Sequence, residues 1–213
     1  MYLAQPPALI LPAATDPLAR PAPPIEGRRT LNRRFPDRPV SFSTEGLGGS
    51  LRRLRADAAA LAICLLLPAV PEDIVAYPVL RIDMEPYVVP DHPLAKLPGP
   101  ASRGDLEPHV QLVLSDPVDT GSANYGVATA KPWRFVDLGR RLDFLLAGFG
   151  WCRMPQHLVA DAVAKGQLVR FQIENDPTPR DGLTIYAAHR RDRTLGPAGR
   201  WLLDELRERL GPA

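Results

Sequence analysis

The sequence predicts an α/β fold, and three observations lead to this prediction. The run from Trp133 to Val169 alternates between strand-like and helix-like patterns, with a boundary residue at each change. The continuous apolar run at 58–67 is typical of a strand that a parallel sheet buries on both faces. The pattern at 197–210 is that of an amphipathic helix. Strands and helices that alternate in this way build sheets whose ligands bind at the strand ends.

The run at 133–169 predicts a strand, a helix, a turn, a second helix and a second strand. Gly148 stands where the end of the first helix favours positive φ. Pro155 stands where we expect the first position of the second helix, because a missing N–H does no harm there. Gly166 ends the second helix. The apolar stripes are Leu138, Leu142, Leu145 and Leu146 in the first helix, and Leu158, Val159, Ala162 and Val163 in the second.

The first half of the chain predicts a strand–helix–strand unit. We expect a helix to stop at Pro36, and the alternating side chains at 40–44 predict a short strand. Ser43 or Thr44 can cap the helix that follows, and the buried strand at 58–67 completes the unit. The apolar stripe of that helix consists of Leu47, Leu51 and Leu54.

The two ends of the chain differ in character. Residues 1–27 carry seven prolines and no periodic apolar pattern, which predicts an irregular arm. In the last helix, Glu205 precedes Arg209 by four residues, a spacing that favours an ion pair on the exposed face. The segments in between predict extended chain at 75–89, a turn at 91–95, a strand at 110–114, a loop at 115–131 and a strand at 183–187.

Length and composition are those of an ordinary globular protein. The chain has 213 residues, 45% of them hydrophobic and 23% charged, and a net charge of +2. Its basic residues form scattered pairs, so no DNA-binding surface stands out. Cys64 and Cys152 lie in apolar segments and are interpreted as reduced core thiols. Without a membrane-length apolar run or the basic start of a secretory signal, we expect a cytoplasmic protein with no membrane partner.

The sequence offers little support for an enzyme, a metal site or a cofactor. It has no G-x-S-x-G nucleophile motif, and the glycines at 46–49 precede no phosphate-binding lysine. Asp83 and Glu85 share one face of a predicted strand, where a solvated face is favoured over an acid/base pair. The histidines lack partners at metal-ligand spacing; they are His92, His109, His157 and His189.

Five stretches spread over most of the chain carry a family resemblance. They are LNRRFPDRPVSFSTEGLGGSLRRLRADAAALAI (31–63), VVPDHPLAKL (88–97), WRFVDLGRRLDFLLAGFGWCRMPQHLV (133–159), KGQLVRF (165–171) and GPAGRWLLDEL (196–206). In this order they resemble the effector-binding (substrate-binding) domain of LysR-type transcriptional regulators. The resemblance covers about residues 28–210, and several dispersed motifs in the right order make it specific.

The resemblance implies a two-lobed fold like that of periplasmic solute-binding proteins (type 2), with flanking helices on each sheet and a small-molecule effector between the lobes. Residues 28–213 would form this domain, with lobe I at about 28–87 and 183–213 and lobe II at about 88–182. In full-length family members an N-terminal winged helix-turn-helix binds DNA. Neither that domain nor the first strand of lobe I is recognisable in residues 1–27.

The resemblance therefore predicts a domain that senses an effector and regulates transcription through rearrangement of its lobes and dimer. The expected partners are a small organic anion and a second chain, either a copy of this one or a full-length relative. We expect no direct DNA binding by this chain alone. Two alternatives stay open. One is a stand-alone solute-binding protein, which the missing export signal disfavours, and the other is a truncated partner that forms DNA-binding-defective heterodimers.

Candidate ligand-binding residues lie on two expected walls of a pocket. Ser43 and Thr44 precede a predicted helix, whose N-terminal end favours carboxylates and other anions. That these hydroxyls only cap the helix is an equally good interpretation, and their position in the family favours the pocket. On the opposite wall, Ser115 and Asp116 end a predicted strand.

The second wall continues through Gly150 to Met154. Trp151 and Met154 offer apolar contact, and Gly150 allows the main chain to approach a ligand. Arg153 can pair with an anionic effector, although an arginine in such a place is more often a surface residue.

Overall fold

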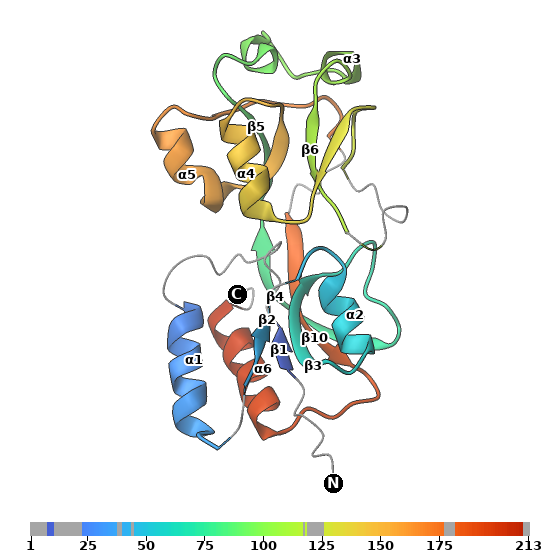
Figure 1. Ribbon diagram of the computed structural model, residues 1–213, viewed down its shortest axis with the longest axis vertical. Helices are drawn as coiled ribbons and strands as arrows, with labels where there is room; N and C mark the ends of the chain where they lie inside the picture. Colours follow the sequence, from blue (N-terminus) through green and yellow to red (C-terminus); the bar gives the residue numbers. More distant parts are fainter. Residues whose placement is uncertain are drawn as a thin grey trace. The chain divides into compact units, whose positions relative to one another are not determined.

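The computed structural model describes residues 8–10, 23–37, 40–43, 45–116, 118, 126–176 and 182–210 (Figure 1). The chain folds into two compact units. Unit 1 consists of Met1–Arg81 and Thr184–Ala213, and unit 2 consists of Ile82–Leu183. Each unit has its own strands and its own helices.

Unit 1 is built on a sheet whose described strands follow the order β2-β1-β3-β10-β4. β1 pairs in parallel with both β2 and β3, whereas β10 pairs antiparallel with β3. In β3, every residue from Leu61 to Cys64 is buried, which confirms the predicted strand with two buried faces. The strands span Phe42–Ser43 (β2), Ala8–Ile10 (β1), Ala59–Leu65 (β3), Leu183–Arg190 (β10) and Ile74–Ile82 (β4).

Helices flank the sheet of unit 1. α1 (Pro23–Arg34) and α6 (Pro197–Leu210) contact each other, and the rings of Phe35 and Trp201 lie 6.3 Å apart. α2 (Gly49–Arg55) lies on the other side of the sheet in Figure 1. The core beneath α2 consists of Leu54, Ala59, Ala62, Cys64, Leu66, Ile74 and Ala188.

The prediction of an irregular arm at 1–27 is wrong in two places. Ala8–Ile10 form β1, in which Leu9 pairs with both Phe42 and Leu61. α1 begins at Pro23, whose fixed φ and missing N–H suit the first turn of a helix. The prolines at 6–7 and 12–21 lie outside the described residues. The N-terminal segment therefore supplies a sheet strand that its sequence pattern does not reveal.

Unit 2 contains two small sheets. In one, β5 pairs antiparallel with both β8 and β9, and in the other β6 pairs in parallel with β7. Two main-chain bonds join the sheets: the Trp151 N–H donates to Val110 O (3.0 Å), and the Leu112 N–H donates to Trp151 O (2.9 Å). The strands span Met84–Val88 (β5), Cys152–Pro155 (β8), Val169–Arg170 (β9), Gln111–Leu114 (β6) and Pro132–Phe135 (β7).

Two apolar clusters form the core of unit 2. The first lies beneath α4 (Leu138–Leu146) and α5 (Gln156–Ala164), and the second lies beside η2 (Pro93–Lys96) and α3 (Arg103–Leu106). The first cluster comprises Tyr87, Leu112, Leu138, Leu145, Cys152, Met154, Val159 and Leu168. The second comprises Val88, Leu94, Ala101, Leu106, Trp151 and Phe171.

Three predicted boundaries differ from the structure. Pro155 ends β8 and is the N-cap of α5, because β8 pairs with β5 as far as Met84. The N-cap of α2 is Gly48 in the left-handed conformation, with no side-chain cap, so Ser43 does not cap this helix. The lobe boundary expected at 87/88 falls inside β5, whose pairing with β8 and β9 places residues 82–87 in unit 2.

His92 makes the stability of unit 2 depend on pH. It is buried, its Nδ1 accepts a hydrogen bond from the Leu94 N–H (3.2 Å), and the ring of His109 lies 4.6 Å away. Burial, together with the charge of His109, lowers the pKa of His92 from 6.5 to about 4. The unfolded chain thus binds a proton near pH 6.5 that the folded state binds only near pH 4. The contribution of neutral His92 to the free energy of unfolding is therefore fully present above pH 6.5 and is lost as the pH falls toward 4.

Because of His92, we expect the free energy of unfolding to be about 2 kcal/mol smaller at pH 5 than at pH 7. His92→Asn keeps an acceptor for the Leu94 N–H but cannot be protonated, so its stability should depend less on pH by that amount. Urea unfolding of both proteins at the two pH values measures the difference. If the free energy of unfolding changed equally with pH in the wild type and in His92→Asn, the prediction would be wrong.

Candidate functional site

The candidate site of unit 2 is centred on β8. Side chains alternate along a strand, so Trp151 and Arg153 share one face while Cys152 and Met154 share the other. A bridge between Gln111 and Trp151 sets β6 and β8 side by side in parallel. The face that carries Trp151 and Arg153 is polar at one end and apolar at the other.

Arg153 provides the positive charge of this face. Its side chain is only 10% exposed, and its Nη2 lies 2.5 Å from Oδ1 of Asp176, whose side chain is 28% exposed. Its guanidinium stands over the Trp151 ring, 5.8 Å from the centroid. Its Nε is buried and has no hydrogen-bond partner among the described residues. The guanidinium therefore has donor capacity beyond its pair with Asp176.

Gln111 shapes the loop beside Arg153. Its side chain is buried, its Nε2 donates to Gly126 O (2.6 Å), and its Oε1 accepts from the Ala128 N–H (2.7 Å). This loop runs close to Arg153, because a Cβ placed on Gly126 would lie 3.9 Å from Nη1 of Arg153. One amide side chain thus fixes the main chain of the loop next to the charged group.

Arg141 supports Arg153 from the opposite face of β8. It lies on α4, is buried, and its Nη2 donates to Arg153 O (2.8 Å) and lies 3.2 Å from Met154 Sδ. Burial lowers the pKa of Arg141, and no described carboxylate forms an ion pair with it. The side chain of Arg141 therefore holds the main chain of Arg153 in place at the cost of burying a charge.

Comparison with known families decides the identity of the chain. Residues 28–211 match the family described as LysR substrate binding domain. The chain belongs to this family. A comparison with curated proteins finds no match.

Solved structures of LysR regulatory domains share the fold. The regulatory domain of MetR, a LysR family regulator from N. meningitidis, aligns over 95% of this chain and 92% of its own, with a TM-score of 0.71 and 18% identity. The CcmR regulatory domain of Synechocystis PCC6803, in complex with 2-PG, aligns over 96% of both chains (TM-score 0.69, 16% identity). The effector binding domain of QuiR, in complex with shikimate, aligns over 93% of both (TM-score 0.67, 18% identity). At these identities the likeness shows the fold, which is α/β and periplasmic-binding-protein-like (type 2).

Within this LysR substrate-binding domain, three of the predicted ligand residues lie in the core. Trp151 is fully buried and packs edge-on against Phe171, 5.7 Å away. Met154 is fully buried in the cluster beneath α4 and α5. Gly150 is buried against Val110, whose carbonyl oxygen would lie 2.2 Å from a Cβ at position 150. The close approach that Gly150 permits is thus an approach to Val110, the residue before β6.

The other predicted ligand residues divide between the units. In unit 2, Ser115 bonds Phe135 O through its N–H (2.8 Å) and its Oγ (3.4 Å), and Asp116 accepts from the Val118 N–H (2.9 Å). In unit 1, Ser43 ends β2, and its buried Oγ has no hydrogen-bond partner among the described residues. Thr44 lies outside the described residues.

Three polar residues of the site could not be found from the sequence. They are Gln111, Arg141 and Asp176, which lie on a strand, on a helix and just after a turn, far apart in the chain. The one available signal was Gln111, a polar residue inside an otherwise apolar strand. The pairing of Arg153 with Asp176, 23 positions later, left no local pattern.

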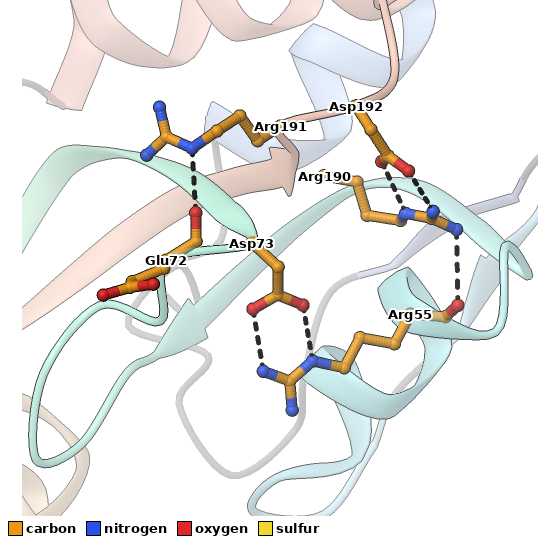
Figure 2. Close-up of polar contacts among 6 residues, drawn as sticks. All are labelled: Arg55, Glu72, Asp73, Arg190, Arg191 and Asp192. Atoms are coloured by element: carbon orange, nitrogen blue, oxygen red, sulfur yellow. Dashed lines mark hydrogen bonds and ion pairs between the residues drawn. The ribbon is translucent and has the colours of Figure 1, made fainter.

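A second polar site of this LysR domain is a cavity of about 440 Å³ in unit 1. Figure 2 shows its two ion pairs, Arg55 with Asp73 and Arg190 with Asp192. Arg55 binds Asp73 through Nε (2.7 Å) and Nη2 (2.8 Å), and this holds the pKa of the Asp73 carboxyl below its usual range. Arg190 likewise lowers the pKa of Asp192. Arg191, also in the cavity wall, donates to the main chain of Glu72 (2.8 Å).

The cavity in unit 1 is best described as a surface network. Its contacts join the end of α2, the start of β4 and the end of β10, and Arg190 also donates to Arg55 O (3.4 Å). Each carboxylate is matched by one guanidinium, and both members of the Arg55–Asp73 pair are about half exposed. Exposed pairs of this kind contribute little to stability. The network of ion pairs around the cavity therefore holds three elements together and leaves few polar groups for a ligand.

The described part of the chain gives no support for a membrane-spanning helix, a metal site or a reactive cysteine. No described helix is both long and apolar enough to cross a membrane. Among the same residues, no group of three His, Cys, Asp or Glu side chains could share a metal ion. Cys64 and Cys152 are buried and free of disulfides, and burial raises the pKa of their thiols to about 12 and about 11. Both thiols are therefore neutral at physiological pH.

Proposed function

We propose that this LysR substrate-binding domain senses a small organic anion and passes the signal to transcription. The observation that carries the proposal is Arg153, a nearly buried guanidinium with a buried Nε and an aromatic ring behind it. A charge in such surroundings binds carboxylates and phosphates well, through short charge-assisted hydrogen bonds. Structures of the same fold hold small molecules, shikimate in QuiR and 2-PG in CcmR, which supports a ligand of this size.

We propose further contacts at the ends of β2 and β6. The buried Oγ of Ser43 would gain the hydrogen bond that no described residue provides. Ser115 and Asp116 follow β6 as polar groups at a strand end, a common place for ligands in α/β sheets. Thr44 is proposed on its sequence position alone.

The proposed mechanism is a shift between conformations. An effector that binds one arrangement of the lobes and the dimer better than another increases the population of that arrangement. The proposed partner is a second copy of the chain or a full-length relative, and the proposed place of action is the cytoplasm. We expect no promoter binding by this chain alone, and a gel shift of operator fragments tests that expectation.

A thermal-shift screen of organic acids, with shikimate among them, tests the proposed function. An acid present at 100 times its Kd should raise the free energy of unfolding by about 2.7 kcal/mol. Arg153→Met should remove most of this gain, because the anion loses its partner. Arg140→Met is the matched control, since Arg140 lies in the same unit with its side chain 76% exposed. If no acid stabilises the folded protein, or if both variants respond like the wild type, the proposal is wrong.

A further inference from the structure

We propose that Asp176 is an internal competitor of the effector, holding the guanidinium that the effector's carboxylate or phosphate would bind. The inference rests on the proposed function, because it assigns Arg153 to the effector's anionic group. It adds a regulatory element to that site: a carboxylate of the chain itself that any anionic ligand must displace.

The geometry of the pair resembles that of a bound anion. Oδ1 of Asp176 lies 2.5 Å from Nη2 of Arg153, within the range of charge-assisted hydrogen bonds. The arginine side chain is 10% exposed and the aspartate side chain 28%, so the pair is more open on the side of the carboxylate. An anion that arrives from solvent therefore reaches Arg153 where Asp176 already lies.

The two partners are held very differently. Arg153 pairs with Pro86 of β5, and its carbonyl accepts a hydrogen bond from the buried Arg141. Asp176 follows a turn in which Asn175 has positive φ (49°). Two contacts with Ala101 anchor that turn, a bridge to Ile173 and a hydrogen bond from the Glu174 N–H (2.9 Å). Arg153 is thus fixed within a sheet, whereas Asp176 lies at the end of a turn.

Release of Asp176 would also affect the turn that precedes it. In the chain, the turn at 173–176 precedes β10, which starts at Leu183 and lies in the sheet of unit 1. An effector that takes the place of Asp176 would remove the contact that ties the end of this turn to Arg153. Competition also lowers the apparent affinity, which equals the intrinsic affinity multiplied by the fraction of time that Asp176 leaves Arg153 free.

The test compares the wild type with Asp176→Asn, which keeps the shape of the side chain and removes its charge. Shikimate and inorganic sulfate serve as probes in calorimetric titrations at constant ionic strength. If Asp176 occupies Arg153 nine-tenths of the time, the variant should bind the probe about tenfold more tightly. Asp161→Asn is the control, because Asp161 is an exposed aspartate on α5 of the same unit.

Each outcome separates the two proposals. If the wild type binds a probe and Asp176→Asn binds it equally or more weakly, Asp176 does not compete and the sensing function stands. If neither protein binds any acid of the screen while both are folded, the sensing function fails and the competition with it. If Asp161→Asn tightens binding as much as Asp176→Asn does, the effect is one of net charge and the inference is overturned.

Discussion

Replacing Gly150 with alanine is expected to destabilise the protein by about 3 kcal/mol or more. The added Cβ would lie 2.2 Å from the carbonyl oxygen of Val110 and 3.0 Å from its carbonyl carbon. Because these are main-chain atoms, no side-chain rotation relieves the overlap, and the start of β6 must move away. The hydrogen bond from the Trp151 N–H to Val110 O (3.0 Å) would then be lost. Urea unfolding followed by circular dichroism measures the effect.

Gly99→Ala is the matched control for Gly150→Ala. Gly99 lies in the same unit, no atom lies within 4 Å of a Cβ placed there, and its φ is not positive. The control should change the free energy of unfolding by less than about 0.5 kcal/mol. Two glycine variants of equal stability would contradict the close packing of β6 on Gly150.

Replacing Trp151 with alanine is expected to cost about 3–5 kcal/mol of stability, the usual range for a large buried aromatic side chain. The ring is 0% exposed and packs edge-on against Phe171 in the second core cluster of unit 2. Its removal would leave a cavity between β8 and the segment that follows β9. Chemical unfolding measures the loss, and a titration with an organic acid found in the screen measures affinity.

Trp133→Ala provides the comparison for Trp151→Ala. The Trp133 side chain is 42% exposed on β7, so its removal should cost clearly less stability. If Trp151 formed the surface of the effector pocket instead of its support, Trp151→Ala would abolish acid binding and leave stability nearly unchanged. That result would contradict the assignment of Trp151 to the core.

The sequence predicted most elements, because their patterns are local. The stripe of Leu138, Leu142 and Leu145 and the positive φ of Gly148 (76°) mark α4 and its end without reference to the rest of the chain. The same holds for the closing helix, where Glu205 and Arg209 form the predicted ion pair. Helices with a clear apolar face need no knowledge of distant residues.

Short strands could not be predicted in the same way, since their partners define them. β1 has three residues between prolines, and only its pairing with β2 and β3 makes it a strand. β8 exists because residues 152–155 pair with β5, nearly 70 positions earlier in the chain. Without that pairing, Gly150 resembled a ligand contact and Pro155 resembled the start of a helix.

The candidate site was predictable in its charge but not in its support. Arg153 stood out as a cation next to an aromatic residue and remains the proposed anion contact. Its neighbours Arg141 and Asp176 became evident only when the fold placed them, one behind the strand and one on a turn. A sequence pattern can indicate the chemistry of a group, whereas its burial and its partners depend on three-dimensional contacts.

The position of β10 has a consequence for how the protein is made. β10 lies between β3 and β4 in the sheet of unit 1, although it is the last strand to be synthesised. Until residues 183–190 have left the ribosome, the nascent chain cannot join β4 to that sheet. Unit 2, by contrast, is one uninterrupted stretch, Ile82–Leu183, and is complete earlier. We therefore expect unit 2 to fold first during translation. Until β10 is synthesised, one edge of β3 stays unpaired.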